Sequence, residues 1–181
     1  MHRRRLLLLA PAAMATGLAR AADPSPPPEL AQALPSSRLR GEGRMTFLAL
    51  HIYDIRLWSP QPVDASNWAS SPLALAITYA RTLYGDSIAE RSIDEMRRQG
   101  EIDAATSARW LDEMKRLFPD VGDGTRLTGV LRPGIGAAFF HDGQPRGEVR
   151  DPAFARRFFG IWLAPETSEP ALRTRLLGGA K

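Results

Sequence analysis

Residues 73–81 read Leu-Ala-Leu-Ala-Ile-Thr-Tyr-Ala-Arg. Large side chains alternate with small ones along this segment, and that period-two pattern is typical of a β-strand. The alternation places Leu75, Ile77 and Tyr79 on one face and the alanines on the other. We expect the flat alanine face to pack closely against another layer, formed by helices. The fold class then follows from the elements on either side of this strand.

Strand patterns and helix patterns alternate in blocks along the rest of the chain. Residues 37–58 predict one strand covered on both sides, because apolar residues occupy both of its faces near the middle. The first helix after residues 73–81 is expected to begin at a capping box of Ser87 and Glu90. The other elements are helices at 103–118, from 151 and from 168 to 178, a strand at 125–132, and a hairpin of strands 135–141 and 144–149. This order predicts an α+β fold, in which a large antiparallel sheet is covered on one side by a layer of helices.

The N-terminus has the pattern of an export signal. Residues 3–5 are arginines, residues 6–18 carry no charge, and Ala19-Arg20-Ala21 is a small-x-small cleavage site. The apolar run is shorter than the roughly 20 residues of a membrane-spanning helix, so we expect no integral membrane span in the mature protein. The arginines fit general secretory (Sec) or twin-arginine (Tat) export, and both routes predict a periplasmic protein. We divide the chain into a cleaved signal peptide at 1–21, a proline-rich flexible linker at 22–36 and one domain at 37–178.

Composition excludes several classes of protein. The chain has 181 residues, a formal charge of +4 and no cysteine, so it forms no disulfide, thiolate zinc site or iron–sulfur cluster. The four arginines of the signal peptide account for the whole excess charge, which leaves a neutral mature chain without a basic stripe for nucleic acid. The histidines, His2, His51 and His141, lack metal-ligand spacing, and no dinucleotide fingerprint or Gly-x-Ser-x-Gly motif occurs. We expect no metal ion and no cofactor.

The candidate functional residues are polar side chains inside or beside the apolar strands. They are Arg38, Arg40, Arg44, His51, Tyr53, Tyr79 and Arg81. An arginine on a covered sheet face needs a partner, because an unpaired buried charge is very costly. The partner is either an internal acid or an anionic group of a ligand. Arg81 has a third possibility, since it ends its strand and its head can reach water.

Several short blocks of the sequence resemble the bacterial chalcone isomerase-like domain. They are residues 73–90, 110–121, 126–130, 147–163 and 167–170, and the similarity extends over residues 39–178. The resemblance implies an open-faced β-sandwich, with a ligand cleft between the sheet and its layer of helices. That architecture agrees with the order of elements read from the periodicity.

The resemblance also bears on activity. In chalcone isomerases an arginine near the first strands stabilises the reacting oxygens, and Arg40, or Arg38 if residues are inserted, matches it. His51 stands where the family has a threonine, and Ile88 and Glu95 stand where it has a tyrosine and an asparagine. Because these positions depart from the enzyme pattern, the fatty-acid-binding, non-catalytic branch of the family is the better guide.

Three functions remain open from the sequence. The first is an exported protein that binds a small amphipathic or carboxylate ligand, such as a fatty acid. Its predicted ligand-binding residues are Arg40, His51, Tyr53, Tyr79 and Arg81, with Arg40 or Arg81 on the carboxylate. The alternative is an isomerase (intramolecular lyase) for a chalcone-like or other conjugated carbonyl substrate, with Arg40 as oxyanion stabiliser and His51 as acid or base. The third is an envelope protein whose cleft is vestigial.

Overall fold

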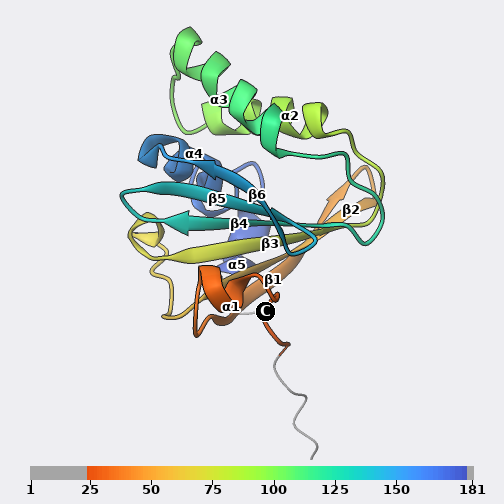
Figure 1. The fold of residues 1–181 in the computed structure, drawn as a ribbon, viewed down its shortest axis with the longest axis vertical. Helices are drawn as coiled ribbons and strands as arrows, with labels where there is room; N and C mark the ends of the chain where they lie inside the picture. Colours follow the sequence, from red (N-terminus) through yellow and green to blue (C-terminus); the bar gives the residue numbers. More distant parts are fainter. Residues whose placement is uncertain (1–23, 179–181) are drawn as a thin grey trace, which may run out of the picture.

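The structure, a computed structural model, describes residues 24–178, and the predicted signal peptide at 1–21 lies outside the described residues. Six antiparallel strands form one sheet in the order β1-β2-β3-β4-β5-β6 (Figure 1). The strands are β1 Arg38–Phe47, β2 Leu50–Ser59, β3 Leu73–Tyr79, β4 Arg126–Arg132, β5 Gly136–His141 and β6 Gln144–Val149. The helices are α1 Leu30–Ala33, α2 Gly85–Arg97, α3 Ala104–Leu117, α4 Pro152–Leu163 and α5 Pro170–Leu176, with a 3-10 turn at Trp68–Ser70. The predicted α+β class is confirmed.

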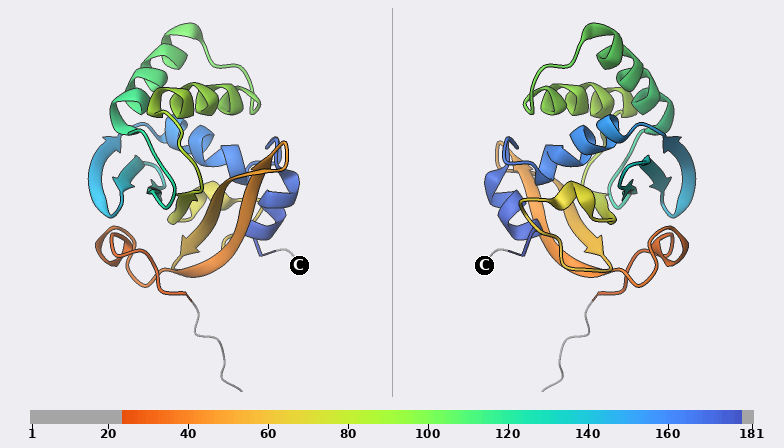
Figure 2. Two further views of the ribbon diagram at one scale, coloured as in Figure 1. Left: turned by 90° about the vertical axis from the view of Figure 1, so that its right-hand side faces the viewer. Right: turned by 90° about the vertical axis from the view of Figure 1, so that its left-hand side faces the viewer.

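The sheet is strongly curved, and the helices are arranged by that curvature. Figure 2 views the strands nearly end-on and shows α4 inside the curve, α2 and α3 above it, and α1 on the outer side. The main core lies inside the curve, where the Phe139 and Phe158 rings meet edge to face with centroids 5.2 Å apart. A large antiparallel sheet covered on one side by a layer of helices is therefore confirmed. No helix within residues 24–178 is long and apolar enough to cross a membrane.

The alanine face of β3 packs closely against a helix, as expected, but that helix is α1, and the main helical layer covers the opposite face. Leu75, Ile77 and Tyr79 point into the main core, under the helices. Ala74 and Ala76 face the outer side, where they pack with Leu30 of α1 and with Trp58, Val130 and Ala138. The space inside the curve is wide and takes large side chains, whereas the one-turn helix α1 lies close to the sheet and needs small ones.

The second half of the predicted linker belongs to the folded domain. Leu30 is fully buried, and the buried Glu29 carboxylate accepts hydrogen bonds from Arg126 at 3.1 and 3.2 Å and from the Thr128 hydroxyl at 2.6 Å. Proline content predicted an extended tether, but these partners lie on β4, far along the chain. The flexible-linker prediction therefore does not hold for residues 29–34.

Residues 37–58 form a hairpin and not the single strand that was expected. β1 and β2 are joined by a two-residue turn at Leu48 and Ala49, whose φ values are +49° and +63°. Such turns favour glycine and asparagine, and neither is present, so the sequence carried no turn signal. Two irregularities in the pairing leave one extra residue each, Arg40 on β1 and Ile52 on β2. An extra residue reverses the inward and outward alternation, which changes where the neighbouring side chains lie.

Aspartate carboxylates bind backbone N–H groups at the starts of α2, α3 and α4. Asp103 and Asp151 accept hydrogen bonds from backbone N–H groups in the first turns of α3 and α4, respectively. The capping box is wrong, because α2 begins at Gly85, whose N–H donates to the Asp120 carboxylate at 2.8 Å. A side chain at Gly85 would collide with the Phe118 carbonyl, so the glycine lets the start of α2 lie against the end of α3.

Candidate ligand cavity

A cavity of about 410 Å³ lies between the inner face of the sheet and the helices. This volume is within the ~300–1,000 Å³ range of small-molecule sites. Its buried floor is apolar and includes Leu75, Phe139 and Phe158. The polar or charged residues that line it are Tyr53, Tyr79, Ser87, Arg91, Ser92, Glu95, Arg146, Trp162, Ser168 and Glu169. The cavity therefore has an apolar floor, and among residues 24–178 only four of those that line it are charged: Arg91, Glu95, Arg146 and Glu169.

Two of the predicted site residues, Tyr53 and Tyr79, line this cavity side by side. Their rings meet edge to face, with centroids 5.9 Å apart. The Tyr53 hydroxyl accepts a hydrogen bond of 2.9 Å from Trp162 Nε1, while the Tyr79 hydroxyl has no hydrogen-bond partner among residues 24–178. Burial raises the pKa of Tyr53 to about 12 and also raises the pKa of Tyr79. Both phenols stay protonated near neutral pH, so each can donate a hydrogen bond to a ligand.

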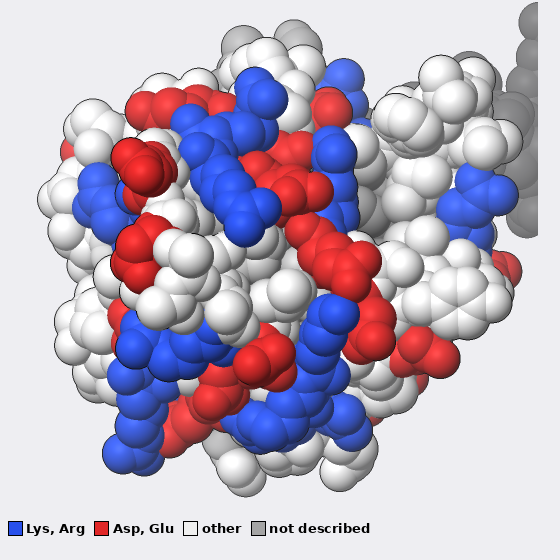
Figure 3. All heavy atoms as spheres, turned by 90° about the horizontal axis from the view of Figure 1, so that it is seen from above, with Lys and Arg blue, Asp and Glu red and all other residues white. Residues whose placement is uncertain are grey.

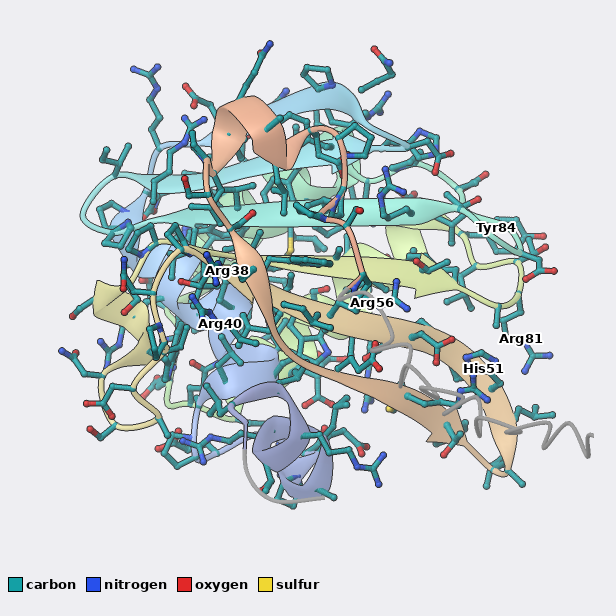
Figure 4. The ribbon with its side chains drawn as sticks, turned by 90° about the horizontal axis from the view of Figure 1, so that it is seen from below. Arg38, Arg40, His51, Arg56, Arg81 and Tyr84 are labelled. Atoms are coloured by element: carbon teal, nitrogen blue, oxygen red, sulfur yellow. The ribbon has the colours of Figure 1, made fainter. Side chains whose placement is uncertain are left out.

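Arg40 lies outside the cavity. As the extra residue of β1 it turns toward the end of β2, where Nε donates to the Ser59 carbonyl at 3.0 Å and Nη2 donates to the Pro60 carbonyl at 2.6 Å. Figure 4 shows Arg38 and Arg40 together, well away from Arg81 and Tyr84 at the opposite end of the sheet. The positions of β1 that face α5 or the cavity are Gly41, Gly43, Met45 and Phe47. The first strand therefore supplies no arginine to the ligand cavity.

His51 and Arg81 also lie outside the cavity. His51 Nε2 is 3.2 Å from Asp54 Oδ1, although not in hydrogen-bond geometry, and Asp54 accepts a hydrogen bond from Arg44 at 2.8 Å. The bond from Arg44 holds the pKa of the Asp54 carboxyl below its ordinary value. The Arg81 side chain extends away from the sheet (Figure 4), which is the third of the possibilities considered for it. The structure thus brings together two of the five predicted residues.

The charged residues of α2 at the cavity were not among the predicted site residues. Glu95 is only 8 % exposed, and its Oε1 lies 2.5 Å from Arg91 Nη2. Its Oε2 has no hydrogen-bond partner within residues 24–178 and is 3.7 Å from Arg98 Nε. The Arg91 side chain is 70 % exposed to water, and it also lines the cavity. The signal for Glu95 was its position, because Ile88 and Glu95 stand where the family has a tyrosine and an asparagine, and both residues line the cavity.

Arg146 of β6 is the other cation of the cavity lining, and no sequence pattern singled it out. Its Nε donates to the Leu117 carbonyl at 3.1 Å, which holds the guanidinium beside the end of α3. Arg146 forms no ion pair within residues 24–178, whereas Arg91 is neutralised by Glu95. It is thus the cation at the cavity whose charge is not already paired.

The exposed members of the lining mark where the cavity opens. Phe47 is 60 % exposed, and Ser87, Arg91 and Arg146 are also exposed, whereas the floor residues are buried. Phe47 precedes the β1–β2 turn, and Arg146 lies near the β5–β6 turn at the same end of the sheet. We refer to Phe47, Ser87, Arg91 and Arg146 as the mouth. The mouth is therefore at the end of the sheet that carries the β1–β2 turn.

The helices above the cavity present charges of both signs to the outside. Figure 3 looks down on α2 and α3 and shows positive and negative side chains interleaved over this face. Cross-helix and local ion pairs account for this pattern, such as Lys115 with Glu90 at 2.7 Å and Arg97 with Asp94 at 3.1 Å. Within residues 24–178 no group of three or more His, Asp or Glu side chains is arranged to hold a metal ion.

Comparison with known proteins agrees with this architecture. The family model described as chalcone isomerase-like matches residues 31–178. The chain belongs to the chalcone isomerase-like family. An uncharacterized protein of Haemophilus influenzae is 30 % identical over 141 residues, which cover 78 % of this chain and 68 % of that protein. The crystal structure of an Arabidopsis thaliana fatty-acid binding protein is similar with a TM-score of 0.63 at 14 % identity, covering 79 % of this chain and 87 % of that one. The similarity to the Arabidopsis structure shows that the two proteins share a fold.

Proposed function

We propose that this protein binds a small amphipathic ligand, with a fatty acid as the first candidate. The observation that carries the proposal is a cavity whose buried floor is apolar and whose charged residues, Arg91, Glu95, Arg146 and Glu169, are few. Burial of an apolar chain against the floor lowers the free energy of the complex. A polar head stays near the charges and the water at the mouth. The Arabidopsis neighbour is described as a fatty-acid binding protein, and the shared fold supports this choice of ligand class.

The head of the ligand is assigned by charge. A carboxylate close to Glu95 and Glu169 meets like charges, and the guanidinium of Arg91 is already paired with Glu95 at 2.5 Å. Arg146 has no carboxylate partner within residues 24–178, and its terminal nitrogens make no hydrogen bond to the protein there. A guanidinium binds a carboxylate through two parallel hydrogen bonds. We therefore place the carboxylate at Arg146 and the apolar chain over Leu75, Phe139 and Phe158.

Arg40 and Arg81 are replaced in this proposal by Arg146, because the structure holds both of them outside the cavity. Tyr79 keeps the role of hydroxyl partner for a polar group inside the cavity. The isomerase alternative depends on Arg40 and His51. Since both lie outside the cavity, the geometry gives that mechanism no support.

We also propose that the protein acts in the periplasm after export. The support is the pattern of residues 1–21 in the sequence, with its arginines, uncharged run and cleavage site before Ala22. N-terminal sequencing of the protein recovered from the periplasmic fraction tests this proposal. Ala22 as the first residue is the expected result, and an intact Met1 in the cytoplasmic fraction contradicts export.

The test of ligand binding begins with the protein purified after expression of the full chain. Native mass spectrometry and extraction into organic solvent reveal any bound lipid, and thermal unfolding is then followed with saturated acids of about 8–18 carbons, a range set by the size of the site. We expect a bound fatty acid, or a rise in unfolding temperature that grows with chain length. A protein that is recovered empty and is stabilised by none of the acids contradicts the proposal.

A further inference from the structure

Four of the five exposed large hydrophobic side chains within residues 24–178 lie at one end of the sheet. The five are Phe47 at 60 %, Leu48 at 80 %, Leu50 at 50 %, Tyr84 at 66 % and Ile135 at 56 % exposure. The first three surround the β1–β2 turn, and Tyr84 lies in the loop after β3, which leaves the sheet at the same end. Ile135 lies between β4 and β5, at the opposite end. We refer to Phe47, Leu48, Leu50 and Tyr84 as the apolar tip.

The apolar tip is continuous with the cavity. Phe47 belongs to both, because it lines the cavity and is 60 % exposed to water. Ile52, which follows the turn, and Leu83, which precedes α2, also line the cavity at this end. An apolar chain that leaves the cavity through the mouth therefore passes directly onto the apolar tip.

The fold does not account for leucine at the top of this hairpin. Leu48 and Ala49 are both in the left-handed region, with φ of +49° and +63°, where asparagine or glycine is favoured. Leu48 is 80 % exposed, so packing against the protein does not compensate for the unfavourable backbone. Phe47 and Leu50 pair across the turn and present two more apolar side chains beside it. The missing contact would be supplied by an apolar partner from outside the molecule.

We infer that the apolar tip docks on a phospholipid bilayer, so that the ligand passes between the acyl chains and the cavity through the mouth. The inference rests on the proposed function, since it assumes that the cavity holds an apolar chain. Leu48 and Leu50 enter the acyl region, and Phe47 connects that region with the cavity. Tyr84 is suited to the boundary, because tyrosine carries an apolar ring and a polar hydroxyl.

The shape and charge of this end favour a bilayer over a protein partner. A stable protein interface takes about 20–30 residues from each side, far more than the few side chains of the apolar tip. The tip is also the end of a hairpin that stands apart from the neighbouring strands (Figure 4). Arg81 and His51 lie at the same end of the sheet (Figure 4), and Arg81 has no ion-pair partner within residues 24–178. A cation in this position is attracted by anionic lipid headgroups.

Vesicle flotation with the purified full chain tests the inference. The vesicles contain phosphatidylcholine, with or without phosphatidylglycerol. The test variant combines Leu48→Asn, which suits the left-handed turn, with Leu50→Thr, which suits a strand. Ile135→Thr is the matched control, because it removes an equally exposed apolar side chain at the opposite end. Binding of monomeric dodecanoate is measured on each protein, so that loss of the cavity is distinguished from loss of docking.

The wild type and Ile135→Thr are expected to float with phosphatidylglycerol vesicles, and the double variant to bind them at least about tenfold more weakly. All three proteins should bind dodecanoate equally. Failure of the wild type to float, or equal flotation of the double variant, overturns the docking inference whatever the dodecanoate result. A wild type that dimerises without binding vesicles, and a double variant that is monomeric, also overturns it in favour of self-association. A wild type that does not bind dodecanoate overturns the proposed function itself.

Discussion

Trp162 Nε1 donates a hydrogen bond of 2.9 Å to the Tyr53 hydroxyl and so joins α4 to β2 across the inner end of the cavity. Tyr53→Phe removes the acceptor and leaves the indole N–H, which belongs to a largely buried residue, without a partner. We expect the free energy of unfolding to fall by about 1–3 kcal/mol, the usual cost of an unsatisfied buried donor. Urea unfolding followed by Trp fluorescence measures the change.

Tyr79→Phe is the matched comparison for Tyr53→Phe. The Tyr79 hydroxyl has no partner among the described residues, so its removal should change stability by less than about 0.5 kcal/mol. Equal losses of stability for the two variants contradict the assignment of a structural role to Tyr53 and a free hydroxyl to Tyr79.

Acid stability should depend on Asp151, the residue that caps α4. Its burial raises its pKa, but hydrogen bonds from Trp110 and from the backbone of Phe154 and Ala153 outweigh that effect and hold the pKa below its ordinary value. A carboxyl whose pKa is lowered by folding stabilises the protein above the unfolded pKa, about 3.9, and loses that contribution as the pH falls through the folded pKa. Asp151→Asn should therefore flatten the decline of stability below about pH 4–5.

Urea midpoints measured from pH 7 to pH 3 test this dependence. Asp151→Asn is also expected to lower stability at pH 7 by about 1 kcal/mol, because it loses the charged cap and the bond from Trp110. A variant whose stability declines with acid as steeply as the wild type places the acid sensitivity at other carboxyls.

Arg146 is the proposed partner of a ligand carboxylate. Arg146→Gln keeps a polar side chain at the mouth but removes the charge, so dodecanoate should bind about tenfold more weakly, while dodecanol should be nearly unaffected. Arg81→Gln serves as the control, because Arg81 is an arginine outside the cavity. Displacement of a fluorescent fatty acid measures both affinities. Equal effects of the two variants contradict the placement of the head at Arg146.

Glu95 should act in the opposite direction. Its buried carboxylate places a negative charge at the cavity, and Glu95→Gln removes that charge and releases Arg91 from its ion pair. We expect dodecanoate affinity to rise several-fold. Glu90→Gln is the matched control on the same helix, since Glu90 pairs with Lys115 away from the cavity. An unchanged affinity in Glu95→Gln shows that the ligand's head lies too far from this charge to respond to it.

The fold could be predicted from the sequence wherever periodicity and local signals agree. The alternation of residues 73–81 and the hairpin expected from residues 135–141 and 144–149 correspond to β3 and to β5 with β6. The β1–β2 turn could not be predicted, because Leu48 and Ala49 carry no local preference for the left-handed region. The place of α1 depended on the long-range bonds of Glu29 to β4, which no local pattern encodes.

The candidate site could be predicted only where the regular alternation of a strand decides which way a side chain points. Tyr53 and Tyr79 were found because strand parity places them correctly relative to the sheet. Arg40 was misplaced because it is the extra residue in an irregular pairing, and a single extra residue redirects the side chain. Arg146 was missed because its position at the mouth depends on how β6 meets the end of α3.

Calorimetric titration of saturated fatty acids into the wild type and into Ser92→Phe tests the central claim most directly, because Ser92 lines the cavity and a larger side chain fills it. We predict one molecule bound per chain, and an affinity that rises by up to about fourfold for each added methylene until the cavity is full. A folded Ser92→Phe should bind at least about tenfold more weakly. Equal affinity for both proteins, or an affinity that does not depend on chain length, contradicts the claim that this cavity holds the apolar chain of a ligand.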